Sequence, residues 1–212
     1  RNLIRNYATV VLLPLALMFT DVAGVGRLQT LMMTGMLVGT VMMSAWGGPK
    51  QWRIRWSMSV MIVHGLAIAF AGLYADISLI VGGMWVMMFT FAMLATLNGP
   101  VYQTKVAPDI QGRVFSTITF LVVVLEPIGM LFVGPITDNF LEPGMLAGGR
   151  LSPAFGGLVG VGPGRGMGLV FLIAGILVAG LGVYGWLNPR VRNLEVELPD
   201  QLPDETKILI DT

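Results

Sequence analysis

The sequence contains no cysteine, a single histidine, and only 12% charged residues among its 212. Without cysteine the chain cannot form a disulfide framework, a thiolate metal site or a thiol nucleophile. One histidine is too few to supply the ligands of a zinc hydrolase. The formal net charge of +1 gives no concentrated basic patch of the kind that binds nucleic acid. These absences predict that the protein is not an enzyme, holds no metal or cofactor, and binds no nucleic acid.

Apolar residues dominate what is present. They make up 55% of the chain, and the mean hydropathy is +0.77. A soluble domain carries about 25% charged residues, so this composition cannot cover a water-facing surface. Disordered chains are poor in apolar residues and rich in charge, which excludes that class as well. The composition predicts an integral membrane protein in a lipid bilayer.

An uncharged apolar run of about 18–20 residues can cross the hydrocarbon as a helix, at 1.5 Å per residue. Six apolar runs predict an all-α, polytopic bundle of six transmembrane helices. The predicted spans are residues 7–20, 28–46, 57–73, 77–97, 115–137 and 167–186. The first run has 14 residues, too few to span alone, and we expect the chain to begin inside or just before that helix. A signal peptide is a weaker interpretation, because no small-residue cleavage site follows.

The basic residues predict the orientation of this bundle. With six spans both termini lie on the same side, and ten of the 13 Lys and Arg residues fall there. The positive-inside rule places that side, and both termini, in the cytoplasm. Amphipathic rings favour the same interface, near which four tryptophans fall: Trp46, Trp52, Trp56 and Trp186. The chain therefore divides into a six-helix bundle, residues 1–186, and a cytoplasmic tail, residues 187–212.

Two connections carry further information. The short turn at 74–76 predicts that the third and fourth spans form an antiparallel hairpin. The predicted outer loop, 138–166, has 29 residues and nine glycines, which is longer than compact domains usually leave without structure. We expect its apolar run 151–161 to lie against the bundle or the membrane surface. Its glycines lack the preceding strand and the following Lys-Ser/Thr of a phosphate-binding loop.

Glu126 falls near the middle of the fifth predicted span. An acidic residue there costs about 2.5–3.5 kcal/mol on insertion scales. Such residues usually face a bundle interior or an aqueous cavity, and they often relay protons. Pro127 follows and leaves the carbonyl of Val123 without its helical hydrogen bond. Two interpretations stay open: Glu126 takes up and releases a proton at a hinge, or a protonated Glu126 only satisfies backbone groups at the kink.

His64 and the methionines are weaker candidates. His64 lies in the third span and could relay protons, because histidine titrates near neutral pH; the alternative is a hydrogen-bonded packing residue. Of 15 methionines, 14 lie in predicted spans, and their flexible side chains suit adaptable apolar pockets. We take Met36, Met87 and Met88 as candidates to face a substrate, with core or lipid packing as the alternative. Gly35-x-x-x-Gly39 is a helix close-packing pattern.

The segment between the fourth and fifth spans carries the most specific motif. The stretch from Asn98 to Phe115 resembles the loop between the tenth and eleventh helices of macrolide-efflux-like transporters of the major facilitator superfamily. The matching residues are Gln103, Lys105, Val106, Pro108, Gln111, Gly112, Arg113, Val114 and Phe115. Glu126-Pro-Ile-Gly129 and Gly134-Pro-Ile-Thr-Asp138 are similar to the eleventh helix of that family. Met36-Leu-Val-Gly-Thr and Trp46-Gly-Gly-Pro-Lys50 are similar to its eighth helix and the basic loop that follows.

This resemblance implies the C-terminal half of a twelve-helix transporter in a bacterial inner membrane, with substrate bound between two six-helix halves. It implies proton-coupled efflux of amphipathic small molecules, with Glu126 carrying the proton and a missing N-terminal half on the same or another chain. Lys105, Gln111, Gly112 and Arg113 would form a cytoplasmic gate. For the loop itself, Pro108 can start a short helix, Gly112 allows close backbone approach, and Arg113 can pair with a carboxylate or simply follow the positive-inside bias.

A second hypothesis comes from a different class. The missing half, the short first span and the long 138–166 loop depart from the family pattern. They also fit a non-transporting, facilitator-derived subunit that packs against other membrane proteins, with the loop and the acidic tail as docking surfaces.

Overall fold

The computed structural model describes residues 22–74, 76–197 and 201, and every regular element within them is a helix. Five helices are long and apolar enough to span a membrane by length and composition. These are α2 (Val22–Trp46), α3 (Arg53–Ala71), α4 (Ile77–Lys105), α5 (Pro108–Ile136) and α8 (Arg165–Leu187). They coincide with five of the six predicted spans and confirm an integral membrane protein of the all-α class. The predicted span 7–20 lies outside the described residues.

The connection between α4 and α5 differs from the expectation of a long loop. Residues 98–114 are almost wholly helical, since α4 continues to Lys105 and α5 begins at Pro108. Proline is favoured at the first position of a helix because its missing N–H would have no helical partner there. Pro108 therefore starts the spanning helix itself, and the short separate helix expected at that position is absent from the described residues.

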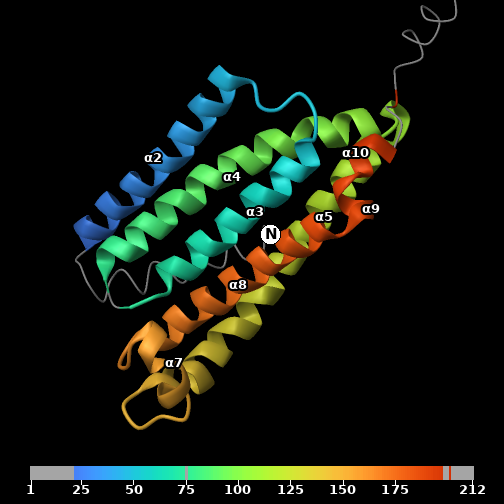
Figure 1. The fold of residues 1–212 in the computed structure, drawn as a ribbon. Helices are drawn as coiled ribbons and strands as arrows, with labels where there is room; N and C mark the ends of the chain where they lie inside the picture. Colours follow the sequence, from blue (N-terminus) through green and yellow to red (C-terminus); the bar gives the residue numbers. More distant parts are fainter. Residues whose placement is uncertain (1–21, 75, 198–200, 202–212) are drawn as a thin grey trace, which may run out of the picture.

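Four of the helices form a layer in the order α2, α4, α3, α8, with each packed against the next (Figure 1). The distance between neighbouring helices in the layer is set by small residues. Apolar side chains gain little free energy by moving from lipid to protein, so helices in a membrane associate mainly through close backbone packing. The predicted hairpin of the third and fourth spans is confirmed by the packing of α3 on α4. Gly83 of α4 contributes to this contact, since a Cβ there would lie 2.7 Å from the carbonyl oxygen of Ala67.

The contact between α3 and α8 is reciprocal. A Cβ on Gly65 would lie 2.6 Å from the carbonyl oxygen of Gly175 and would also strike the backbone nitrogen of Ala179. A Cβ on Gly175 would lie 2.5 Å from the carbonyl oxygen of Gly65 and would strike the backbone nitrogen of Ala69. The two helices thus present the same Gly-x-x-x-Ala pattern to each other. We call these four residues the glycine seam.

The contact between α2 and α4 uses the predicted close-packing pattern. Cβ atoms on Gly35 and Gly39 would lie 2.5 Å and 2.6 Å from the carbonyl oxygens of Trp85 and Phe89. The indole N–H of Trp85 also donates to Thr34 Oγ1 across this contact, at 3.0 Å. The Gly35-x-x-x-Gly39 prediction is therefore confirmed as a packing site.

Residues 138–166 form a folded cap rather than an open loop. The cap contains a π-helical turn, η1 (Thr137–Leu141), and the short helices α6 (Glu142–Met145) and α7 (Ser152–Val159). Met145 and Val159 are fully buried with Ala69 of α3 and with α8, which confirms that the 151–161 run lies against the bundle. The Glu142 carboxylate accepts hydrogen bonds from the backbone N–H groups of Gly164 and Gly166, and so caps the start of α8.

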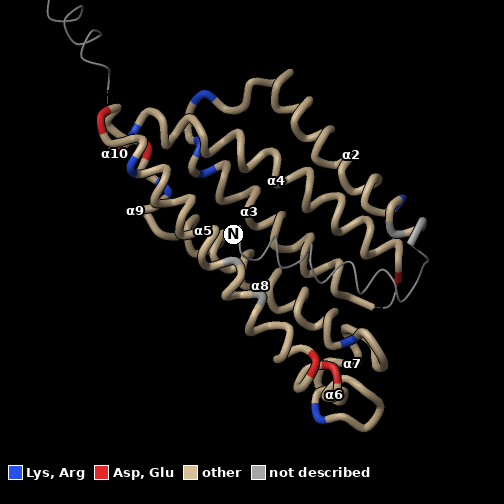
Figure 2. Tube along the Cα trace, turned by 180° about the vertical axis from the view of Figure 1, so that it is seen from behind, with Lys and Arg blue, Asp and Glu red and all other residues tan. Residues whose placement is uncertain are grey.

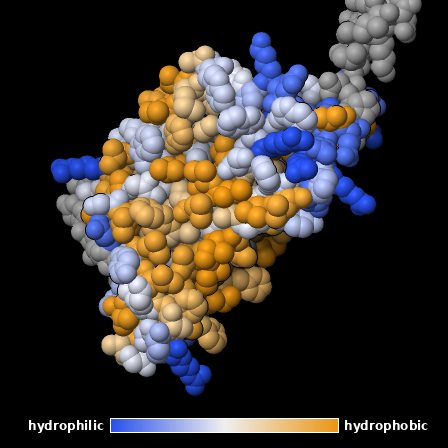
Figure 3. Space-filling model, viewed as in Figure 1, coloured by the Kyte–Doolittle hydropathy of each residue, from blue (hydrophilic) through white to orange (hydrophobic). Residues whose placement is uncertain are grey.

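Charged residues gather at the two ends of the helices, with most Lys and Arg at the end that carries α9 (Pro189–Arg192) and α10 (Leu194–Glu197) (Figure 2). Figure 3 shows apolar residues over the middle of one face and hydrophilic residues toward its ends. This distribution is the one expected of a helical bundle with a lipid-facing belt. We call the end with α9 and α10 the basic end.

Candidate functional site

The predicted proton-coupling residue lies on the least covered helix of the structure. Among the described residues α5 makes no extensive contact with α2, α3 or α4. None of the residues in the most apolar 18-residue stretch of this span is buried. Phe120 and Leu131 are 64% and 70% exposed, so apolar side chains are uncovered along the length of the helix. Glu126 is followed by Pro127 inside this continuous helix, as the sequence predicts.

An apolar groove separates the end of α5 from α8. Its volume is about 350 Å³. It is lined by Val133, Ile136, Leu141, Val170, Ile173, Ala174 and Leu177. Because the groove offers no polar group, it can accommodate only apolar side chains, lipid tails or the apolar part of a ligand.

The predicted cytoplasmic gate residues lie at the α4–α5 junction. The Gln111 side chain donates hydrogen bonds to the carbonyls of Gln103 and Val106, at 2.8 Å and 2.9 Å. These carbonyls belong to the end of α4, where the last turn of a helix leaves acceptors without partners. Gln111 therefore fixes the angle between the two helices. Lys105 points to the tail instead, where its Nζ donates to the carbonyl of Glu195 at 2.6 Å.

Two gate candidates lie on the outer surface of α5. Arg113 is exposed, and its gate role stays a prediction. A Cβ on Gly112 would meet no described atom within 4 Å. The close backbone approach expected at Gly112 is therefore not found in the described part of the chain.

His64 is fully buried between α3 and α4. Its Nδ1 lies 2.8 Å from Thr90 Oγ1, and that hydroxyl lies 2.7 Å from the carbonyl oxygen of Val86. The Thr90 hydroxyl therefore links the His64 ring on α3 to the backbone of α4. This geometry corresponds to the packing interpretation of His64.

The three methionine candidates differ in their surroundings. Met87 and Met88 are buried in the core cluster formed by α2, α3, α4 and α8. Met36 on α2 is 39% exposed. The core position of Met87 and Met88 corresponds to the packing alternative, and a substrate contact of Met36 stays a prediction.

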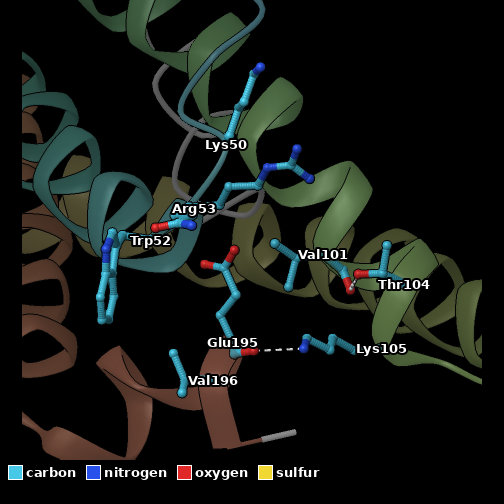
Figure 4. A pocket seen from close by; sticks show the side chains of 9 residues that line it. Lys50, Trp52, Arg53, Val101, Thr104, Lys105, Glu195 and Val196 are labelled. Carbon is cyan, nitrogen blue, oxygen red and sulfur yellow. Dashed lines mark hydrogen bonds between the residues drawn. The ribbon is translucent and has the colours of Figure 1, made fainter. Parts of the chain in front are cut away.

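A polar hollow at the basic end is a feature that the sequence alone did not indicate. It has a volume of about 480 Å³ and lies between the α2–α3 connection, the end of α4 and α10. Figure 4 shows the side chains of these three segments around it. The residues that define it are Lys50, Trp52, Arg53, Thr104, Lys105 and Glu195. We call this feature the basic hollow.

The backbone at the rim of the basic hollow is held in an uncommon conformation. Trp52, with φ 62°, is one of two non-glycine residues of positive φ in the described chain. The guanidinium of Arg55 stacks on its ring at 3.7 Å, a cation–π contact of about 0.5–1 kcal/mol at exposed sites. Arg55 also donates to Asn193 Oδ1 at 2.8 Å. The tail is thereby attached to the start of α3.

The sequence contains a signal for this attachment, in the order of its charged segments rather than in its overall composition. An acidic segment, Leu194–Glu197, follows the last span and returns to the side where the 47–56 connection supplies three basic residues. Opposite charges confined to one membrane face can predict such a contact, although not its partners. No protein-family profile, no curated protein and no solved structure matches this chain.

Proposed function

We propose that this chain is the C-terminal six-helix half of a secondary transporter that exports amphipathic small molecules in exchange for protons. The observation that carries the proposal is α5, a 29-residue apolar helix with an acidic residue near its middle and no described cover. A transporter half exposes such a surface because its substrate path lies against the opposing half. An acidic residue is retained in a spanning helix only when it serves a site or a structural partner.

The glycine seam supports this proposal. The six predicted spans can be divided into two consecutive groups of three. The third span of the first group is α3, and the third span of the second group is α8. Transporter folds built from inverted repeats relate such equivalent helices by a pseudo-two-fold axis. A contact around a two-fold axis is self-complementary, with each side presenting the same pattern to the other. The reciprocal Gly65–Ala69 and Gly175–Ala179 contact has this form.

In the proposed mechanism Glu126 binds a proton from the outer side and releases it to the cytoplasm as the two halves rock. Lys105, Gln111 and Arg113 lie at the cytoplasmic mouth, where Gln111 holds the α4–α5 junction rigid. Both termini are cytoplasmic, and the membrane is a bacterial inner membrane. The resemblance of residues 98–115 to efflux transporters gives the substrate class.

The uncovered α5 also suits the second hypothesis, a non-transporting subunit whose apolar helix packs on another membrane protein. The folded cap and the attached tail leave fewer free docking surfaces than that hypothesis expects. Purification of the native protein in mild detergent separates the two. The transporter proposal expects one second set of six spans, covalently joined or in equal amount. A stable assembly with several other membrane proteins and no such half would contradict it.

A further inference from the structure

The basic hollow already holds a carboxylate in the manner of a bound anion. Oε2 of Glu195 accepts a hydrogen bond from the backbone N–H of Ile54 at 3.3 Å. Ile54 is the second residue of α3, and the first N–H groups of a helix lack helical partners and carry partial positive charge. A negatively charged oxygen is therefore bound at this point, although it comes from the tail of the same chain.

Three of the residues that line the hollow together with Glu195 are cationic. Arg53 and Lys50 come from the α2–α3 connection and the start of α3, and Lys105 comes from the end of α4 (Figure 4). Arg53 uses its Nε on the carbonyl of Pro49, at 3.1 Å, which directs the guanidinium without neutralising it. Among the described residues that line the hollow, three are cationic and one, Glu195, is acidic; the Nζ of Lys105 is directed to the backbone carbonyl of Glu195 rather than to its carboxylate.

The hollow lies at the depth of the membrane interface. Trp46 and Trp56, at the end of α2 and in the first turn of α3, pack edge to face with ring centroids 5.9 Å apart, and both are about half exposed. Tryptophans of this kind mark the head-group level of a bilayer. A cavity of about 480 Å³ is large enough for a phosphate group and the polar part of a lipid head group, since ligand sites begin at about 300 Å³.

We propose that the basic hollow binds the phosphodiester head group of an anionic membrane lipid. The phosphate oxygens take the place of the Glu195 carboxylate at the start of α3, with Lys50 and Arg53 as counter-charges. Lipid and tail then compete for one site, so an anionic membrane releases α10 from α3. This site is separate from Glu126 and does not depend on transport.

The test measures lipid binding to the purified full chain by native mass spectrometry. The probes are phosphatidylglycerol, which is anionic, and phosphatidylcholine, which has the same phosphodiester without net charge. Lys50→Gln and Arg53→Gln each remove one cation, and each is expected to weaken phosphatidylglycerol binding about fivefold. Arg190→Gln removes the same charge from an exposed position at the same end, outside the hollow, and is expected to change binding less than twofold.

Glu195→Gln distinguishes competition from simple attraction. It removes the competing charge, and phosphatidylglycerol is expected to bind several-fold more tightly to it than to the original protein. Equal binding of the two lipids, or an equal loss in Arg190→Gln, would overturn the proposal. So would occupation of the site by inorganic phosphate at millimolar concentration with no preference for the lipid. Weaker binding in Glu195→Gln would show that the carboxylate supports the site and would also overturn it.

Discussion

The glycine seam makes a sharp prediction because α8 contains a matched control. Gly175 lies in the seam, where a Cβ would come within 2.6 Å of the Cα of Ala69 and 2.5 Å of the carbonyl oxygen of Gly65. Gly180 lies five residues further along the same helix, is exposed, and would have no described atom within 4 Å of a Cβ. Gly175→Ala and Gly180→Ala therefore add the same methyl group to one helix, with and without a neighbouring backbone.

The expected change in the free energy of unfolding follows from two opposing effects. Alanine is favoured over glycine in a helix by about 0.5–1 kcal/mol, and this gain applies to both variants. Gly175→Ala additionally forces α3 and α8 apart, because the obstructing atoms are backbone and cannot rotate away. Overpacking of a close contact costs typically 1–3 kcal/mol. We expect Gly180→Ala to be neutral or slightly stabilising, and Gly175→Ala to lose about 1–2 kcal/mol.

Thermal unfolding in detergent or lipid measures the difference. One kcal/mol corresponds to about 2–4 °C for a chain of this size, so the Tm of Gly175→Ala is expected several degrees below that of Gly180→Ala. Gly65→Ala is expected to match Gly175→Ala, because the contact is reciprocal. Equal Tm values for Gly175→Ala and Gly180→Ala would refute the seam as the contact that holds α3 to α8.

Three further predictions follow from single contacts. Thr90→Val removes the hydroxyl that lies 2.8 Å from His64 Nδ1, and is expected to lower the free energy of unfolding by about 1–3 kcal/mol. Thr90→Ser keeps a hydroxyl and should retain the original stability. A Val variant as stable as the original would contradict the hydrogen bond. Glu142→Gln weakens the cap on α8 beside the buried Arg165, so hydrogen exchange at the amides of Gly164 and Gly166 should accelerate, whereas the nearby exposed Asp138→Asn should leave them unchanged. Hydrogen bonds from Ser78 lower the pKa of Asp76 below its ordinary value, so its stabilising effect is complete above the unfolded pKa and is lost as pH falls through the lower folded pKa. The original protein should therefore lose more stability than Asp76→Asn between neutral pH and about pH 3, and parallel curves would exclude this role.

The spans could be predicted from sequence because a lipid-spanning helix has one dominant requirement, an uncharged apolar run of sufficient length. The runs at 28–46 and 167–186 lie inside α2 and α8 for this reason. The ends of the helices were less predictable. Lys105 and Asp109 lie between the predicted spans 77–97 and 115–137, yet α4 extends to Lys105 and α5 begins at Pro108, since backbone hydrogen bonding persists in the interfacial region where charge is tolerated.

Contacts between elements far apart in the chain could not be predicted. Glycine at 65 and 175 is visible in the sequence, but nothing in the sequence states that these two positions face each other. The same holds for Glu142, which finds its partners at 164 and 166, and for Glu195, which finds Ile54. In each case the residue acquires its role only when packing brings two distant segments together.

Proton-driven transport tests the central claim most directly. Inverted membrane vesicles that contain the full-length native protein receive a pH gradient, and the uptake of fluorescent amphipathic dyes is measured. Glu126→Gln keeps the shape of the side chain but cannot ionise, and Asp109→Asn removes an equal charge at the exposed start of the same helix. We expect gradient-driven uptake in the original protein and in Asp109→Asn, and its loss in Glu126→Gln with unchanged folding. Undiminished uptake in Glu126→Gln would remove Glu126 from the mechanism, and a failure of the original protein to move any dye would contradict the transporter proposal.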